Sequence, residues 1–585
     1  MDRKSWFGVV VCMLLLVGWN FYAEYRWPNR AAKKPASTTA TTSTPVTSTS
    51  ATPATAGKPA NGDVPSLGNT TASAKLPEPK IPANAGVEQF TTLENDLFIV
   101  HFTSFGGAIK TVELKKHVDE GDRKVTLNRY GHEAVFNLVG WDGDYTQVPY
   151  TMEKTEDAVI FSRVLPSGAV LKRTYRLAPN YQVQLDQQVS NPTTKDVVLP
   201  EYRLNVGTAA PSHVLDNAIY LFGSYCLEQG ASFHKVNVTD FAASSTFGLF
   251  AREARSRISS EGGPLLWSAV KNQFFAFILS PRDSLMLKGA EFEPIKLVDF
   301  GAKTSTVPEG IRGQAVVNGF SVPAGQSVMQ PFSLYAGPKT YAHLDLLPRH
   351  ENLVMDSWFG FIVRPLLFGM NFLHKFIPSW GWTIIAMTIL IKGLLWPLQS
   401  IANKSMKQMQ ALQPKMEQIR QKYKDDAQKM NIEVMQLYKD YGVNPVGGCL
   451  PMLMQMPIFI GFYVMLQSAV ELRGHSFWWI HDLVQPDTVA SFMVLGHNIA
   501  INPLPLLMTA TQVLLMKMTP TTGDNQQAKM MQWMPVVLLF VLYNFAAALA
   551  LYWTVSNLIS MIQTYVNLRK PVPIMKRVPK TKALK

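Results

Sequence analysis

The sequence predicts a multi-domain membrane protein, with an α-helical membrane region of six spans and a β-sandwich domain on the outer side of the membrane. Charged residues make up only 17% of the 585 residues, whereas hydrophobic residues make up 47%. Long blocks of the C-terminal half carry almost no charge, as membrane spans require. From about residue 90 to 340 the polarity instead alternates with the period of strands. The net charge of +13 predicts cation-rich segments on the cytoplasmic side.

The N-terminal residues 1–27 are predicted to form the first span. Arg3 and Lys4 precede an uncharged run, Ser5–Ala23, which fits either a cleaved signal peptide or a retained anchor. The run ends in interfacial aromatic residues rather than in a small-residue cleavage site, and this favours the anchor. Residues 28–86 are rich in Ala, Ser, Thr and Pro, cannot bury a core, and are therefore predicted to be a flexible tether.

Residues 87–345 are predicted to form one large β sandwich. Runs such as LFIVHFTSFGGAIKTVEL and AVIFSRVLPSGAVLKRTYRLA alternate apolar with polar residues, and Gly, Pro and Asn separate them. This pattern is typical of antiparallel strands with one face in a core. The following segment, 350–378, places large apolar residues on one helical stripe and is predicted to lie in the membrane interface. An ordinary short span is the alternative, but Arg364–Pro365 in its middle favours the interfacial helix.

The region 379–568 is predicted to contain five further spans. The last uncharged block, Met530–Leu568, is long enough for two short spans with a turn at Asn544–Ala548. Segment 400–448 has eight Lys/Arg against five Asp/Glu, and the tail 569–585 has seven Lys/Arg and no acid. Both should face the cytoplasm. Six spans satisfy this with both termini inside and residues 28–378 largely outside. The predicted core spans are 380–399, 446–470, 490–516, 532–545 and 549–567.

The cytoplasmic segment 400–442 is predicted to be a helical hairpin. Two sets of apolar residues, separated by Asp425–Asp426, each follow the 4, 3, 4 spacing of an a/d seam. Core packing is the simpler role for their methionines, and a flexible surface for apolar substrate segments is the alternative. The two sets are Leu412, Met416, Ile419 and Tyr423, and Met430, Val434, Leu437 and Tyr441.

Lys392 is the most informative single residue, because it lies inside the apolar run TILIKGLLWPLQ. A lysine at membrane depth costs on the order of 2.5–3.5 kcal/mol on insertion scales. Its side chain either snorkels to the headgroups or faces a polar cavity. Thr388 and Gln399 share roughly its helical face, and Gln512 and Trp553 can supply polar lining from other spans. These five residues are the predicted substrate groove.

Several function classes lack support. The spans contain no HExxH, P-loop or GxSxG motif and no carboxylate pair, and the three cysteines have no CxxC spacing. We therefore predict a protein that is not an enzyme and has no catalytic residue, cofactor or metal. A transporter or channel with an intramembrane charged site is the main alternative, but the inverted repeats typical of transporters are not visible. A sugar-binding role for the β domain rests on fold analogy alone.

The C-terminal half resembles the YidC membrane protein insertase family of the Oxa-type superfamily. The tether and β domain are similar to those of the Gram-negative type with a large periplasmic domain, with LYAGPK (334–339) as the clearest local match. The motifs that carry the resemblance are LQPK (412–415), VNPVGGCLPMLMQMPIFIGFYVML (443–466), VELR (470–473), WIHDL (479–483), KMTPTT (517–522), MQWMP (531–535) and LYWTVSNLISMIQ (551–563).

The resemblance implies a five-helix insertase core behind a separate N-terminal anchor in the bacterial cell inner membrane. It implies a hydrophilic groove open to cytoplasm and lipid, with a cation in the second span, where Lys392 stands. It implies insertion and assisted folding of nascent membrane proteins, alone or with the Sec translocon, and no cofactor. The ribosome, through the hairpin and the tail 569–585, and membrane lipids are further expected partners. The stretch Asn544–Ala548 departs from the Phe-Pro-Ser/Ala-Gly turn of many relatives.

Overall fold

The computed structural model describes most of the chain from residue 87 onward. The predicted anchor (1–27), the tether (28–86) and residues 572–585 of the basic tail lie outside the described residues. The described ranges are 87–119, 123–131, 133–141, 147–212, 216, 218–246, 250–282, 287–297, 309–355, 359–424, 426–443, 450–494, 497–519, 525–569 and 571.

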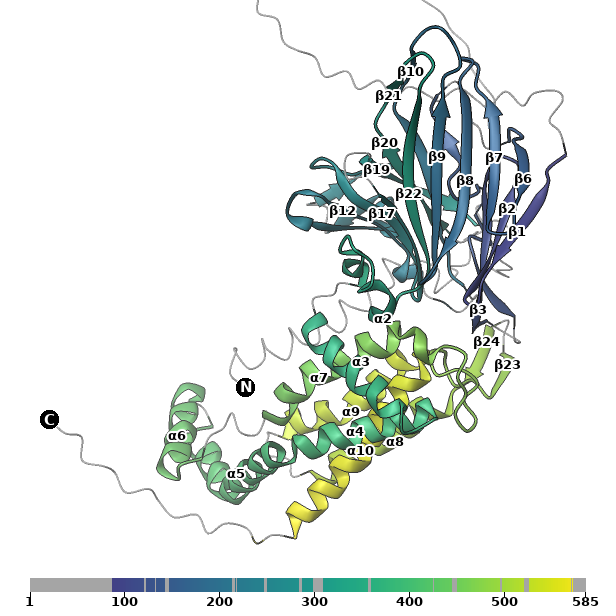
Figure 1. Ribbon diagram of the computed structural model, residues 1–585. Coiled ribbons are helices and arrows are strands. Elements are labelled where there is room, and N and C mark those ends of the chain that lie inside the picture. Colours follow the sequence, from purple (N-terminus) through teal and green to yellow (C-terminus); the bar gives the residue numbers. More distant parts are fainter. Residues whose placement is uncertain are drawn as a thin grey trace, which may run out of the picture.

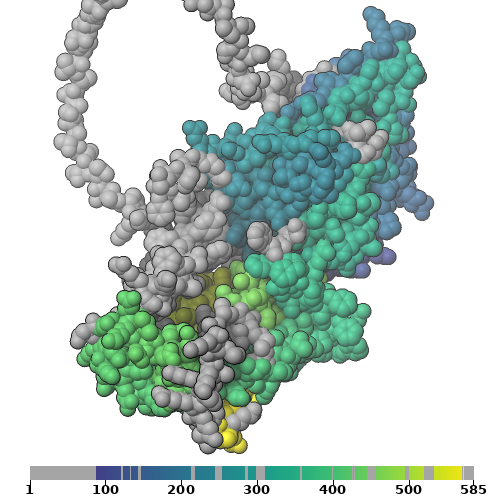
Figure 2. Space-filling model, turned by 90° about the vertical axis from the view of Figure 1, so that its left-hand side faces the viewer, coloured from purple at the N-terminus to yellow at the C-terminus, as the bar shows by residue number. Residues whose placement is uncertain are grey.

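The chain folds into two parts, a β domain and a helical region, which lie one above the other (Figure 1). Figure 2 shows the same stacking from a second direction. The prediction of a β-sandwich-like domain followed by a helical C-terminal region is confirmed at this level.

The largest sheet of the β domain has nine strands in the described chain, all antiparallel to their neighbours. Strand β9, QVQLDQQVS, shows why: every second side chain is buried, so one face enters the core. In spatial order the strands are β13 (Phe233–Asn237), β12 (Phe222–Leu227), β17 (Leu265–Lys271), β18 (Phe275–Pro281), β22 (Ser327–Pro338), β9 (Gln182–Ser190), β8 (Val170–Ala178), β7 (Ala158–Val164) and β6 (Thr151–Lys154).

Two smaller sheets cover this sheet, and a buried arginine helps to join the layers. Arg173 of β8 is fully buried and donates hydrogen bonds to the carbonyls of Gly106 at 2.9 Å and Phe136 at 2.7 Å. The five-stranded sheet contains β16 (Ile258–Ser259), β19 (Leu287–Lys296), β20 (Glu309–Val317), β11 (Tyr202–Ala209) and β5 (Leu138–Val139). The four-stranded sheet contains β1 (Phe90–Glu94), β2 (Phe98–Thr103), β3 (Ala108–Val118) and β4 (Lys124–Leu127). Two-stranded pairs are β10 (Val197–Leu199) with β21 (Phe320–Val322) and β14 (Ser244–Thr246) with β15 (Phe250–Arg252).

Short helices connect the β domain to the helical region. Helix α2 (Tyr341–Leu344) and the 3-10 helix η6 (Glu351–Met355) precede α3 (Gly360–His374). Helix α3 is apolar on two sides. One side is buried, and the opposite side exposes large aromatic residues. The buried residues are Val363, Leu366, Leu367 and Met370, and the exposed ones are Phe361, Phe368 and Phe372.

The helical region contains seven further described helices. They are α4 (Trp380–Leu394), α5 (Trp396–Lys422), α6 (Ala427–Asp440), α7 (Leu450–Ser468), α8 (Pro503–Met518), α9 (Asn525–Leu542) and α10 (Ala547–Leu568). In the described residues no single helix has both the length and the apolar composition of a membrane span; one bent pair, Trp380–Leu394 with Gln399–Lys422, meets that test, with a bend of 61°. The six spans therefore remain a prediction.

The structure differs from the predicted span 490–516. Strands β23 (Ala490–Val494) and β24 (His497–Ile501) pair as an antiparallel hairpin, and helix α8 begins only at Pro503. Asn502, which precedes the helix, has an extended backbone. Proline suits the first helical position because the N–H that it lacks would have no intrahelical partner there. Strand and helix are both compatible with an uncharged run of this kind, so hydropathy did not separate them.

Helices α5 and α6 pack against each other on the side of the helical region away from the β domain (Figure 1). Lys407 of α5 donates to the carbonyl of Asn567 near the C-terminal end of α10, where a cation is favourable. The cluster between α5 and α6 contains most of the predicted seam. It comprises Met409, Leu412, Met416, Leu437, Tyr438 and Val443, with Ile419, Val434 and Tyr441 packed against them.

Candidate functional site

The ammonium group of Lys392 lies where three helices meet. Lys392 is in the last turn of α4. Its Nζ donates to Oε1 of Gln455 on α7 at 3.1 Å and to Oγ of Ser560 on α10 at 3.0 Å. Both acceptors are neutral, so the positive charge is hydrogen-bonded without being neutralised by them. A cation held in this way can attract an anionic group that approaches it.

The polar contacts continue from Lys392 along α10. Gln455, which accepts from Lys392, donates through Nε2 to the hydroxyl of Tyr552 at 3.1 Å. The Tyr552 ring stacks on Phe462 of α7, with 4.1 Å between centroids and 12° between planes. Tyr552 and Ser560 are eight residues apart in α10, which places them on one helical face. One face of α10 therefore supplies two members of the Lys392 network.

A second polar pair joins α8 to α10. The indole Nε1 of Trp553 donates to Oε1 of Gln512 at 3.2 Å. The Trp553 ring meets Phe459 of α7 edge to face, with 4.7 Å between centroids. Close by, Asn557 donates to the hydroxyl of Thr511 at 3.2 Å. Gln512 and Trp553 thus contact each other, as two of the predicted groove residues.

The other two predicted residues do not join Lys392. Thr388 is 1% exposed, and its hydroxyl donates to the carbonyl of Ile384 one turn earlier at 2.7 Å. Gln399 lies beyond the break at Leu395, in α5, and its side chain reaches Asn403 at 3.4 Å. Within the described chain the side-chain hydrogen bonds of Lys392 go to Gln455 and Ser560, not to the four other predicted residues.

Sequence reasoning missed Gln455, Tyr552 and Ser560. A signal for the α10 residues was present, because polar side chains recur there at spacings of four, four and three residues, which is one face of a helix. The residues of this face are Tyr552, Ser556, Ser560 and Gln563. Gln455 is the one polar side chain in LPMLMQMPIFIGF, and such a residue in an apolar helix usually faces a partner.

The surface of the helical region exposes large apolar side chains. On α9 the exposed residues Trp533, Val537 and Phe540 follow a spacing of four and three, which forms one stripe. Trp533 is 69% exposed and Phe540 is 78% exposed. An apolar surface of this kind is unfavourable in water and suits contact with lipid or another apolar segment. Across the described ranges, no group of three or more His, Cys, Asp or Glu residues is placed to hold a metal ion.

Comparisons with known proteins agree over both parts of the chain. The family model described as 60Kd inner membrane protein matches residues 372–573, and the model described as YidC periplasmic domain matches residues 91–368. A membrane protein insertase YidC from Pelobacter propionicus is 32% identical over 540 residues, which cover 87% of this chain and 92% of that protein. One from Chlorobaculum tepidum is 29% identical and covers 97% and 95%. A crystal structure of an active YidC insertase with its first transmembrane domain resolved matches with a TM-score of 0.36 and 16% identity, over 83% of this chain and 93% of that chain.

Proposed function

The chain belongs to the YidC family of inner-membrane protein insertases, and we propose that it inserts and helps to fold nascent membrane proteins through a hydrophilic groove around Lys392. In this proposal the groove opens to the cytoplasm and to lipid and is closed on the outer side. The protein performs no covalent chemistry. Binding and displacement of the substrate's polar and apolar segments are its whole mechanism.

The observation that carries the proposal is the position of Lys392 among α4, α7 and α10. Its Nζ has two neutral hydrogen-bond partners, 3.1 Å and 3.0 Å away. A charge inside an apolar helix is costly unless it faces a polar pathway or a partner. Neutral partners lower that cost and leave the charge available to a third group, such as a carboxylate of an incoming segment.

Three effects then drive insertion: electrostatic attraction, burial of apolar surface and the membrane potential. Lys392 attracts acidic residues in a polar tail or loop of the substrate, which enters the groove without crossing the full thickness of hydrocarbon. The substrate's apolar helix passes along α7 and α9 into lipid, and burial of its apolar surface drives the step. The exposed stripe Trp533, Val537 and Phe540 of α9 supports this route. The membrane potential assists outward movement of negative tails.

The proposed topology has six spans, both termini in the cytoplasm and residues 28–378 largely in the periplasm. The β domain and the α5–α6 pair occupy opposite ends of the helical region, which supports their placement on opposite sides of the membrane (Figure 1). The aromatic side of α3 supports an interfacial position for that helix.

Cytoplasmic partners are proposed from charge. The tail 569–585 has seven Lys/Arg and no acid, and such a segment binds a polyanion such as ribosomal RNA electrostatically. Anionic lipid headgroups compete for it. Deleting residues 569–585 should reduce co-sedimentation with ribosomes while membrane integration is retained; unchanged co-sedimentation would contradict ribosome binding by the tail. Cooperation with the Sec translocon is proposed from the family alone.

The test of the insertase uses proteoliposomes that contain only this protein. Insertion of a small single-span substrate is followed by protease protection for the wild type, Lys392→Ala and Lys392→Arg, with the exposed Lys404→Ala as control. We expect insertion by the wild type, the Arg variant and the control, and loss with Lys392→Ala, most strongly for substrates with acidic tails. Equal insertion by all four would remove the role of Lys392. A solute-dependent current without insertion would favour a transporter or channel.

A further inference from the structure

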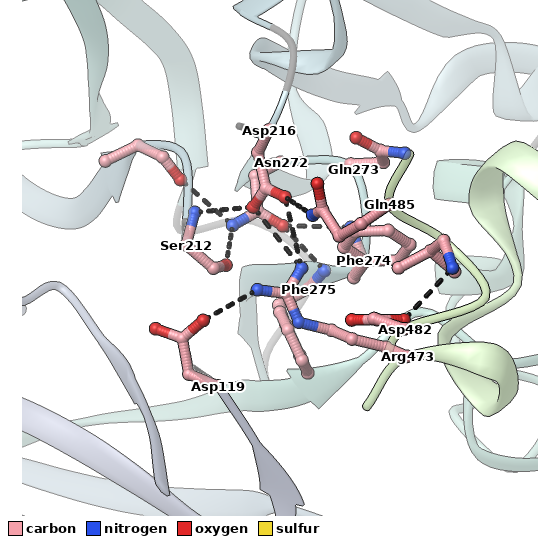
Figure 3. Close-up of polar contacts among 12 residues, drawn as sticks. Asp119, Ser212, Asp216, Asn272, Gln273, Phe274, Phe275, Arg473, Asp482 and Gln485 are labelled. Carbon is pink, nitrogen blue, oxygen red and sulfur yellow. Dashed lines mark hydrogen bonds and ion pairs between the residues drawn. The ribbon is translucent and has the colours of Figure 1, made fainter. Parts of the chain in front are cut away.

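The β domain meets the helical region at a buried cluster of charges around Arg473 (Figure 3). Arg473 follows the 3-10 helix η8 (Val470–Leu472) after α7. Its guanidinium lies 3.1 Å from Oδ1 of Asp119, at the end of β3, and 3.3 Å from Oδ2 of Asp216, between β11 and β12. The three side chains are only 4%, 6% and 4% exposed. Asp119 also pairs with Arg123 at 2.9 Å, so cations and carboxylates alternate along the cluster.

Further contacts cross the same boundary. Gln273, in the turn between β17 and β18, donates to the carbonyl of Gln467 at the end of α7 at 2.6 Å. The hydroxyl of Tyr220 donates to the side chain of Gln467 at 3.2 Å. The Arg473 guanidinium also lies 4.8 Å from the ring centroid of Phe274. The interface is therefore polar, buried and formed by several separate segments of the β domain.

Gln485 links this interface to the groove helix α10. Its side-chain Nε2 donates to Oδ1 of Asp216 at 3.3 Å. Its backbone carbonyl accepts from the N–H of Ala547 at 2.8 Å, and the carbonyl of Leu483 accepts from Ala548 at 2.9 Å. The first N–H groups of a helix have no intrahelical partner, so the loop that carries Gln485 satisfies the start of α10. The same helix carries Tyr552 and Ser560 of the Lys392 network.

We propose that Arg473 is a positioning residue, which docks the β domain on the outer loop 469–487 and through that loop fixes the N-terminus of α10. Removing one partner of a buried ion pair leaves the other charge uncompensated, so the docked state should be sensitive to each member. The docking itself does not rest on the proposed insertase function; only an effect of Arg473 on substrate insertion would.

The docking is tested by distances between two spin labels in the full chain, after alanine replaces its three cysteines. One label replaces the exposed Val198 of β10 and the other replaces the exposed Lys375 after α3. We expect a narrow distance distribution in the parent chain, a broad one in Arg473→Gln, and partial recovery in Arg473→Lys. Arg176→Gln is the control, since Arg176 pairs with Asp186 on the exposed surface of the β domain. A narrow distribution in Arg473→Gln would overturn the proposal.

The second readout is amide exchange at Ala547 and Ala548. Exchange should become at least about tenfold faster in Arg473→Gln and stay unchanged in Arg176→Gln. If Arg473→Gln does not fold, Asp119→Asn and Asp216→Asn are used for both readouts, and unchanged distances and exchange in both would overturn the proposal. These measurements need no substrate, so failure of wild-type insertion would contradict the insertase function and leave the docking result standing.

Discussion

The ammonium nitrogen of Lys392 lies 3.0 Å from the hydroxyl oxygen of Ser560, 168 positions later in the chain. Helix α10 thereby supplies one of the two acceptors of the cation, and α7 supplies the other through Gln455. The contact joins two helices that are distant in the sequence. The polar surroundings of Lys392 therefore come from two neutral side chains, Gln455 and Ser560.

Replacing Ser560 by alanine should weaken the Lys392 site without removing its charge. A hydrogen bond to a charged group contributes roughly 1.5–3 kcal/mol, so Ser560→Ala should lower the midpoint of thermal denaturation in detergent and slow insertion of substrates with acidic tails. Ser560→Thr keeps a hydroxyl and is the matched control. Identical behaviour of the alanine and threonine variants would show that this hydrogen bond is unimportant.

The Gln512–Trp553 pair gives a second prediction. Trp553→Phe removes the indole donor that lies 3.2 Å from Gln512 Oε1 but keeps an aromatic ring near Phe459. Leaving a part-buried acceptor without its partner should cost about 1–3 kcal/mol. Trp533→Phe, on the exposed stripe of α9, is the matched substitution and should be nearly neutral. Equal losses of thermal stability in the two variants would contradict this role of the pair.

The sequence was most informative where one strong physical cost acts locally. Lys392 stood out because a charge in an apolar run is expensive, and in the structure its ammonium group contacts the polar side chains of Gln455 and Ser560. Alternating polarity predicted strands because a sheet buries one face. Neither signal shows which segments of the chain contact each other. The acceptors Gln455 and Ser560 come from other helices, and the nine-strand order depends on pairings between distant runs.

The hairpin of β23 and β24 shows a different limit. Its residues belong to an uncharged stretch, and an apolar run alone does not distinguish a strand from part of a helix. The pair Asn502–Pro503 was the local sign that a helix begins there. The groove residues Thr388 and Gln399 were assigned from helical spacing. The break at Leu395 invalidates that spacing for Gln399, because it separates α4 from α5.

The stability of the β domain should fall in acid because of His117. The pKa of His117 is lowered from 6.5 to about 4, chiefly by burial and to a smaller extent by the nearby positive groups His343, Arg473 and Lys116. A histidine with a lowered folded pKa contributes its stability above its unfolded pKa and loses it as the pH falls through the folded pKa. Between pH 6.5 and 4 the wild type should therefore lose more thermal stability than His117→Phe. Parallel pH profiles of the two proteins would contradict this assignment.

Two glycines of α4 should respond differently to replacement by alanine. A Cβ on Gly381 would collide with the ring of Phe477, whereas a Cβ on Gly393 has no described heavy atom within 4 Å. Phe477 is buried and stacks on Trp478 with 4.9 Å between centroids.

Gly381→Ala must therefore displace an aromatic cluster at the N-terminal end of α4, and overpacking of this kind typically costs about 1–3 kcal/mol. Gly393→Ala removes backbone freedom of the unfolded chain and should be neutral or stabilise by about 0.5–1 kcal/mol. Thermal denaturation in detergent measures both. Because the two substitutions share one helix and one chemistry, a shift in the same direction would show that helix propensity, and not the packing of Phe477, decides the response at Gly381.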